Sequence, residues 1–133
     1  MSIDAIGKMK AALPIRIFHG ASEDLTPIAQ CRDYVVRLRT AGKDAAIYEY
    51  PGAYHSFDYA ALPPHQPLAG IINWSKCSFV ERDGAIVDAA TEESAGIGSR
   101  CVGWTGTVGH HLDAHRKATD DLGEFFRALF RLS

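Results

Sequence analysis

The chain contains an acid and a base whose types and surroundings suit hydrolytic chemistry. Asp24 stands in the segment 19–27, and His55 stands in the aromatic-rich segment 50–58. In a nucleophile–His–Asp system, the imidazole takes a proton from the attacking hydroxyl or thiol, and the carboxylate holds the imidazole in the required tautomer. Asp24 and His55 are therefore candidates for the orienting acid and the general base.

Each candidate follows a segment that is predicted to be a β-strand. Residues 15–19 are rich in β-branched and aromatic side chains and end at Gly20, and residues 45–50 end at a Pro-Gly pair. Between them, Thr26 and the proline after it predict the N-cap and first position of a helix. The helix is predicted to bury one face, formed by Ile28, Cys31, Val35 and Leu38.

This order of elements predicts a parallel strand–helix–strand unit, because the crossover is long enough for a right-handed connection. Parallel strands send their carboxyl-terminal loops to the same edge of a sheet, where ligand sites of open α/β sheets lie. Neighbouring strands are about 4.8 Å apart. We therefore expect Asp24 and His55 to lie within hydrogen-bonding reach of each other.

The order nucleophile, acid, histidine is typical of the α/β-hydrolase fold, in which the nucleophile occupies a Gly-x-Ser/Cys-x-Gly elbow. No such pentapeptide occurs in the chain. The nearest segment, Ser99–Gly103, lacks the first glycine and follows His55, so Cys101 is a poor candidate. We expect residues 1–133 to be a single domain that forms the C-terminal portion of an α/β-hydrolase, with the nucleophile, Cys or Ser, elsewhere.

Both candidates also have structural interpretations. Asp24 can belong to a polar turn before the helix, and His55 can be a half-buried histidine among aromatic residues. His110, His111 and His115 form a cluster in which the last two are four apart, as on a metal-binding helix face. No His-Glu-x-x-His motif accompanies the cluster, so we interpret it as an exposed helix start and expect no metal site.

The remaining segments predict smaller elements. Residues 2–12 resemble a short amphipathic helix, residues 63–67 a loop, and residues 91–110 an irregular segment. Residues 77–90 predict a β-hairpin that turns at Asp-Gly. A C-terminal helix is predicted from about residue 113 to about residue 132. We treat residues 66–110 as an insertion, and the sequence leaves open whether its cysteines, Cys77 and Cys101, form a disulfide.

Composition excludes several classes of partner. The chain has 133 residues and a net charge of −2, without a basic block longer than two residues, so nucleic acid is not an expected partner. No apolar run approaches the roughly 18 residues of a membrane-spanning helix, so no membrane partner is expected either. The compartment is left open, with the cytoplasm favoured over the periplasm.

Several stretches of the sequence resemble the dienelactone hydrolase family. They are Pro14–Gly20, Asp24–Pro27, Cys31–Tyr34 and Tyr50–Asp58, together with the aromatic C-terminal helix. The segment from Cys77 to residue 109 resembles an insertion in one branch of that family. The match covers nearly all of this chain but only the C-terminal half of the family's domain.

The resemblance implies an α/β-hydrolase fold and a Cys–His–Asp triad, with Ser in place of Cys in relatives. It also implies hydrolysis of a small ester or lactone without a cofactor or metal. Asp24 and His55 carry over as catalytic residues, and Tyr54 and Phe57 are expected to form walls of the substrate pocket. The nucleophile elbow and the oxyanion hole do not carry over, so this chain alone is expected to hydrolyse esters poorly or not at all.

A non-enzymatic alternative follows from the same features. Two parallel strands cannot cover both of their own faces, and at least one strand edge is expected to lie open. The chain would then be a truncated or split product that acts as a binding or assembly module. Its expected partner is a second copy of itself or a complementary N-terminal half.

Overall fold

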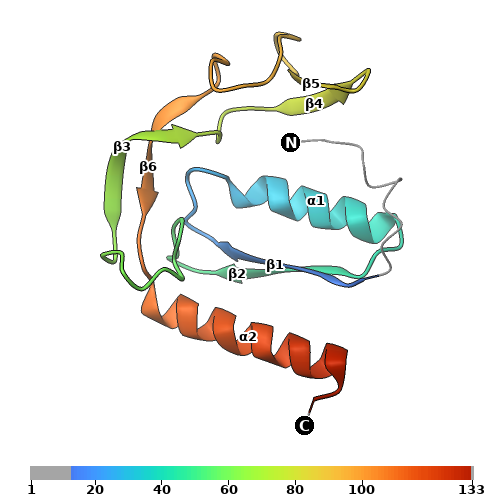
Figure 1. The fold of residues 1–133 in the computed structure, drawn as a ribbon, viewed down its shortest axis with the longest axis vertical. Helices are drawn as coiled ribbons and strands as arrows, with labels where there is room; N and C mark the ends of the chain where they lie inside the picture. The colour runs from blue at the N-terminus through green and yellow to red at the C-terminus, as the bar shows by residue number, and fades with distance from the viewer. Residues whose placement is uncertain (1–12, 133) are drawn as a thin grey trace.

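The computed structural model describes residues 13–132, so the helix predicted over residues 2–12 lies outside the described part. Strand β1 (Ile15–Gly20) pairs in parallel with β2 (Ala45–Tyr50), and helix α1 (Ile28–Thr40) connects them. In this register Ile15 lies opposite Ala45. Both strands therefore end at the same edge of the two-stranded sheet, and the loops that follow them begin side by side (Figure 1).

The side chains of β1 and β2 alternate between two covered faces. The residues on the first face pack against Val35 and Leu38 of α1, and Leu38 is completely buried. These strand residues are Ile15, Ile17, Ala45 and Ile47. Because successive strand side chains point to opposite faces, the residues between them cover the other side of the sheet.

That other face packs against α2 (Leu112–Phe130), so the sheet lies between the two helices (Figure 1). Phe18 and Tyr48 are opposite each other in the register and stack with ring centroids 5.1 Å apart. Tyr50 packs nearby with Ala114 at the start of α2. Among the described residues, no helix is long and apolar enough to cross a membrane.

A buried polar contact joins β2 to α2. The Tyr50 hydroxyl donates a hydrogen bond of 3.0 Å to Asp121, and the Lys117 ammonium also bonds this carboxylate. Asp121 is only 6% exposed, so both partners are needed to compensate for burying its charge. Burial, followed by the hydrogen bond to Asp121 and the charge of its carboxylate, raises the pKa of Tyr50 above its ordinary value.

Helix α1 begins differently from the sequence prediction. The N-cap is Pro27, which has no side-chain oxygen to cap the helix, and the hydroxyl of Thr26 does not take this role. The carboxylate of Glu23 instead accepts hydrogen bonds from the backbone N–H groups of Leu25 and Thr26. The Glu23 side chain thus satisfies two backbone N–H donors just before the helix. The preference for Ser, Thr, Asp or Asn at the N-cap does not by itself predict this arrangement.

An antiparallel pair of strands stands at the carboxyl ends of β1 and β2. Strand β3 (Gln66–Asn73) pairs with β6 (Gly103–Val108), so that Gln66 lies opposite Val108 (Figure 1). The predictions of a loop over residues 63–67 and an irregular segment over residues 91–110 are wrong in part. Neither β3 nor β6 shows a clear alternation of apolar and polar residues. The two strands can be recognised only from their pairing with each other, and they are far apart in the sequence.

Between these strands, β4 (Phe79–Arg82) and β5 (Ala85–Asp88) form a β-hairpin above α1 (Figure 1). Its two turn residues, Asp83 and Gly84, have φ angles of 51° and 80°. Positive φ at both positions matches the tight hairpin turn that Asp-Gly favours. A disulfide between Cys77 and Cys101 closes the base of this region.

Candidate functional site

The loop after β1 and the loop after β2 are bonded to each other beyond the ends of the strands. The backbone N–H of Ala21 donates to Tyr50 O at 2.9 Å, and that of Ser22 donates to Ala53 O at 3.0 Å. This close approach requires glycine at position 20, because a Cβ there would lie 2.3 Å from the carbonyl oxygen of Ala53. The two loops therefore carry their side chains to one place.

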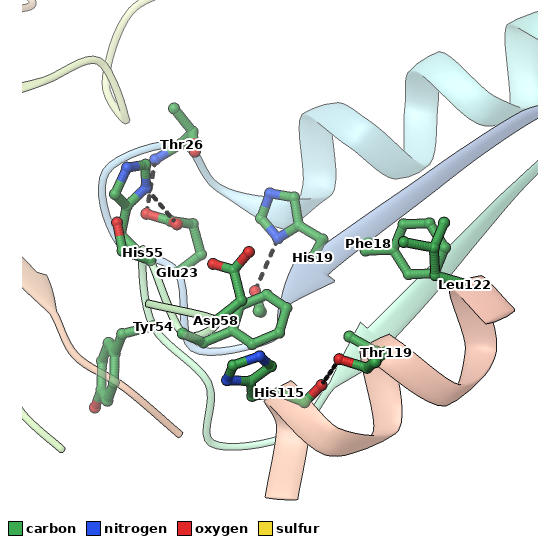
Figure 2. Close-up of a pocket in the computed structure, with 14 residues that line it drawn as sticks. Phe18, His19, Glu23, Thr26, Tyr54, His55, Asp58, His115, Thr119 and Leu122 are labelled. Carbon is green, nitrogen blue, oxygen red and sulfur yellow. Dashed lines mark hydrogen bonds and ion pairs between the residues drawn. The ribbon is translucent and has the colours of Figure 1, made fainter. Parts of the chain in front are cut away.

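His55 and Glu23 form the central contact of the site. The His55 Nδ1 atom lies 2.9 Å from Glu23 Oε2, as Figure 2 shows. The other carboxylate oxygen, Oε1, accepts from the backbone N–H of Leu25 at 2.8 Å and of Thr26 at 3.2 Å. The Glu23 side chain is 6% exposed and that of His55 is 43% exposed. A buried, fixed carboxylate thus supports a histidine that faces solvent.

This geometry defines what the imidazole can do. An ionised carboxylate only accepts hydrogen bonds, so Nδ1 of a neutral His55 carries the proton. Nε2 then has a free lone pair, which is the form of histidine that acts as a general base. When Nε2 takes a proton, the negative charge of Glu23 stabilises the imidazolium.

Asp24, the acid expected from the sequence, makes a different contact. Its Oδ1 accepts from the backbone N–H of Thr107 at 2.9 Å, and its Oδ2 accepts from the Thr107 hydroxyl at 2.7 Å. The expected hydrogen bond between Asp24 and His55 is therefore corrected: Glu23 supplies the carboxylate. The physical reason is that β6 occupies the position beside Asp24, and no clear residue pattern indicates that strand.

The end of β6 and the residues directly after it also hold the backbone that carries His55, which forms a parallel bridge with Val108. The backbone N–H of Gly109 donates to His55 O at 3.0 Å, and that of His111 donates to Phe57 O at 2.9 Å. On the opposite side of β6, the Asn73 amide bridges Asp24 O at 3.0 Å and Thr105 O at 2.6 Å. Both loops of the site are thus attached to the same strand, which fixes their relative position.

A cavity of about 500 Å³ opens beside His55 and Glu23. Tyr54 and Phe57, the expected pocket walls, both line it, and Phe57 is itself buried. Figure 2 shows Phe18 of β1 and Leu122 of α2 at the end of the cavity away from His55. The volume lies within the usual range for small-molecule sites. Among the described residues that line it, none is a lysine or arginine.

The histidine cluster is arranged differently from the helix-face pair that its spacing suggests. His110 Nε2 lies 3.0 Å from His115 Nδ1, whereas the His111 side chain caps α2 by accepting from Ala114 N at 3.2 Å. His115 also lines the cavity near His55. Within residues 13–132, no group of three or more histidine, cysteine or acidic residues is arranged to hold a metal ion.

The described residues do not provide an evident nucleophile for His55. Cys101 is bonded to Cys77 in the disulfide, so it has no thiol. Cys31 is free, but burial, followed by the charge of Glu23, raises its pKa and favours the unreactive thiol form. Ser56 lines the cavity with a φ of 59°, but it follows His55 directly and lies outside a strand-to-helix elbow.

The chain shares sequence similarity with a known esterase. It is 37% identical over 82 residues to Esterase LipQ of Mycobacterium tuberculosis, and the match covers 53% of this chain. The chain spans only about a fifth of the length of this curated relative, 20% of which is covered. No protein-family model matches the chain, and no solved structure matches it. The similarity indicates a relationship to esterases and hydrolases.

Proposed function

We propose that this chain supplies the general base and its orienting acid to an ester hydrolase site of the dienelactone hydrolase type. In this proposal, β1, α1, β2 and α2 are the C-terminal portion of an α/β-hydrolase fold. The observation that carries the proposal is the hydrogen bond of 2.9 Å between His55 Nδ1 and the buried Glu23 carboxylate. Its position at the carboxyl ends of parallel strands, where α/β sheets place their sites, supports it.

The proposed reaction follows from this arrangement. His55 Nε2 takes the proton of a serine or cysteine nucleophile, which attacks the ester carbonyl carbon. The imidazolium then gives that proton to the departing alkoxide, and an acyl-enzyme remains. A water molecule, deprotonated by the same nitrogen, attacks the acyl carbon. The imidazolium then returns this proton to the departing oxygen or sulfur of the nucleophile, and the acid is released. Glu23 orients the imidazole and stabilises its positive charge through both halves of the cycle.

The nucleophile and the oxyanion donors of this reaction lie outside residues 13–132 in our proposal. Because no elbow pentapeptide is present in the sequence, we place them in a preceding segment of a longer chain or in a separate polypeptide. The substrate is a small ester or lactone, as the similarity to an esterase suggests. The absence of cationic side chains from the described cavity lining favours an uncharged substrate over a carboxylate-bearing one.

The reactivity of His55 tests this proposal without requiring the nucleophile. Diethyl pyrocarbonate acylates unprotonated imidazole nitrogens, and p-nitrophenyl acetate is attacked slowly by the same atoms. We expect His55 to be acylated by diethyl pyrocarbonate, and the slow release of p-nitrophenol to decrease in His55→Ala, in which the other five histidines remain. Glu23→Ala is expected to reduce both rates at least threefold, because the imidazole loses its fixed tautomer and orientation.

Asp24→Asn is the matched comparison, since it removes the negative charge of the neighbouring carboxylate just as Glu23→Ala removes that of Glu23. It is expected to leave the rates per folded molecule unchanged, because Asp24 bonds Thr107. The proposal is wrong if His55→Ala leaves p-nitrophenol release unaltered. If Asp24→Asn reduces the acylation and p-nitrophenol release rates and Glu23→Ala does not, His55 remains the general base but Asp24 is its orienting acid.

A second candidate function is that of a binding or assembly module. The observation in its favour is that β1 and β2 form a sheet of only two strands in the described part of the chain. In addition, α2 exposes apolar side chains, namely Leu122, Phe126, Leu129 and Phe130. Sedimentation of the purified chain separates the alternatives: a stable self-assembly together with an unreactive His55 supports the module, and a reactive His55 supports the hydrolase site.

A further inference from the structure

A second cavity, of about 350 Å³, lies on the other side of Thr26 from the His55 cavity. Thr26 lines both cavities, so they meet at this residue. The second cavity is lined by residues of two different regions: one runs from the loop before α1 into its first turn, and the other runs from the end of β3 to the first residue of β4. These residues are Thr26, Gln30, Trp74, Cys77 and Phe79.

Several contacts hold the walls of this cavity in place. The indole of Trp74 and the ring of Phe79 meet edge to face, with centroids 5.7 Å apart. The backbone N–H of Trp74 donates to Leu25 O at 3.2 Å, which joins it to the loop that carries Glu23. The Gln30 amide donates to Cys77 O at 3.4 Å. The aromatic wall is therefore attached to both α1 and the candidate site.

The lining determines which chemical group the cavity suits. Two aromatic residues and the disulfide-bonded Cys77 line it, and none of the described residues in its lining carries a charge. Aromatic side chains favour flat rings, which they contact edge to face or in offset stacks. A cavity of roughly 150 Å³ is enough to hold benzene, so one of about 350 Å³ accommodates one or two rings.

We propose that this second cavity is a subsite for the ring-bearing, uncharged end of the substrate, whose ester group lies at His55. The assignment of the ester rests on the proposed function, whereas the binding of the ring rests on the second cavity alone. An ester that reaches past Thr26 would place its carbonyl beside the imidazole and its ring against the wall formed by Trp74 and Phe79. Recognition of the ring is then independent of catalysis.

Trp74 provides a direct probe of ring binding. The chain has two tryptophans, and Trp104 is 49% exposed on β6, so Trp104→Phe leaves Trp74 as the sole indole. In this background we would titrate N-benzylbutyramide, an uncharged amide with one phenyl ring, and N-ethylbutyramide, which lacks the ring. The Trp74 fluorescence and its indole N–H resonance report binding. We expect saturable binding of the benzyl compound, roughly tenfold or more tighter than that of the ethyl compound.

Two variants test whether the ring occupies this cavity. Gln30→Phe fills the cavity from an exposed position on α1 without adding a second indole, and it is expected to weaken binding of the benzyl compound at least tenfold. Asp33→Phe, which adds the same ring at an exposed α1 position that lines neither cavity, is the matched control and is expected to bind normally. Phe79→Ala removes one aromatic wall and is also expected to weaken binding. The subsite is disproved if both amides bind with equal affinity or if Gln30→Phe binds the benzyl compound as well as Asp33→Phe does.

Failure of the subsite and failure of the proposed function give different results. His55→Ala is expected to retain full affinity for the benzyl compound, because the ring site does not include the imidazole. Loss of benzyl selectivity with a reactive His55 would overturn the subsite alone. Retained selectivity with an unreactive His55 would overturn the hydrolase proposal and leave the ring-binding site in place.

Discussion

The imidazole of His55 lies 2.9 Å from the Glu23 carboxylate, and Glu23 is almost completely buried whereas His55 is not. Adjacent in sequence, Glu23 and Asp24 have separate roles because their side chains leave the loop in different directions. The Glu23 carboxylate orients the histidine and satisfies two backbone N–H groups before α1. The Asp24 carboxylate attaches the same loop to Thr107 of β6.

The contact between Asp24 and Thr107 is expected to stabilise the fold. Asp24→Ala removes two hydrogen bonds to a charged group and leaves the Thr107 N–H without its partner. We expect a loss of about 2–4 kcal/mol in the free energy of unfolding, measured in urea. Asp33→Ala, at an exposed position of α1, serves as the control and is expected to change stability by less than about 0.5 kcal/mol. Equal stability of the two variants would contradict the role of Asp24.

The close approach of the two loops depends on Gly20. In Gly20→Ala, the new methyl group would lie 2.3 Å from Ala53 O, a backbone atom that moves only if the His55 loop moves. We expect thermal unfolding to show a loss of about 3 kcal/mol or more, together with loss of the hydrogen bond between His55 and Glu23. Gly96→Ala is the matched control, since a Cβ there has no atom within 4 Å. If Gly20→Ala is as stable as this control, the proposed packing of the loops is incorrect.

The buried contact of Tyr50 with Asp121 predicts a loss of stability at alkaline pH. Because the pKa of Tyr50 is raised in the folded state, the unfolded chain releases the phenolic proton first, near its ordinary value of 10.0. The contribution of Tyr50 is therefore complete below pH 10 and decreases as the pH rises toward its folded pKa. Lys117, whose hydrogen bond to Asp121 raises its pKa, contributes in the same direction.

Urea unfolding at several values between about pH 9 and pH 11 measures this effect. Tyr50→Phe is expected to lower stability at neutral pH but to show a shallower decline above pH 10 than the wild type. Tyr59→Phe changes a tyrosine that is 60% exposed and is expected to follow the wild-type profile. Parallel profiles for wild type and Tyr50→Phe would show that Tyr50 does not titrate as described.

The disulfide between Cys77 and Cys101 closes the region that contains the β4–β5 hairpin. Linking residues with a separation of 24 is expected to contribute about 3 kcal/mol, mainly by restricting the unfolded chain. The double variant Cys77→Ser, Cys101→Ser should therefore unfold at a lower temperature than the wild type under oxidising conditions. Reduction should lower the unfolding temperature of the wild type and leave that of the double variant unchanged. A wild type insensitive to reduction would contradict this prediction.

Local patterns in the sequence were sufficient to locate the elements that carry the site. β-Branched and aromatic residues indicated the strand over residues 15–19, which ends at Gly20. A Pro-Gly pair marked the end of the strand over residues 45–50, and β1 and β2 lie at these two places. The hairpin turn at Asp83 was identifiable because Asp-Gly tolerates positive φ. In each case, residues close together in sequence determine the conformation.

The partner of His55 could not be identified from such patterns. A carboxylate at position 23 or 24 satisfies the spacing equally well, and the choice between them depends on where β6 lies. Strand β6 pairs with β3 through a register irregularity near Ala69, so neither strand shows the regular alternation that reveals a strand. The residue adjacent to a candidate acid should therefore be considered whenever it also carries a carboxylate.

The hydrogen on His55 Nδ1 provides the most direct test of the account. Long-range ¹H–¹⁵N correlation spectra, recorded at a pH where the imidazole is neutral, identify which ring nitrogen carries it. We predict a protonated Nδ1 and an unprotonated Nε2 in the wild type and in Asp24→Asn, and loss of this single tautomer in Glu23→Ala. A protonated Nε2 in the wild type, or a tautomer that Glu23→Ala leaves unchanged, would contradict the account.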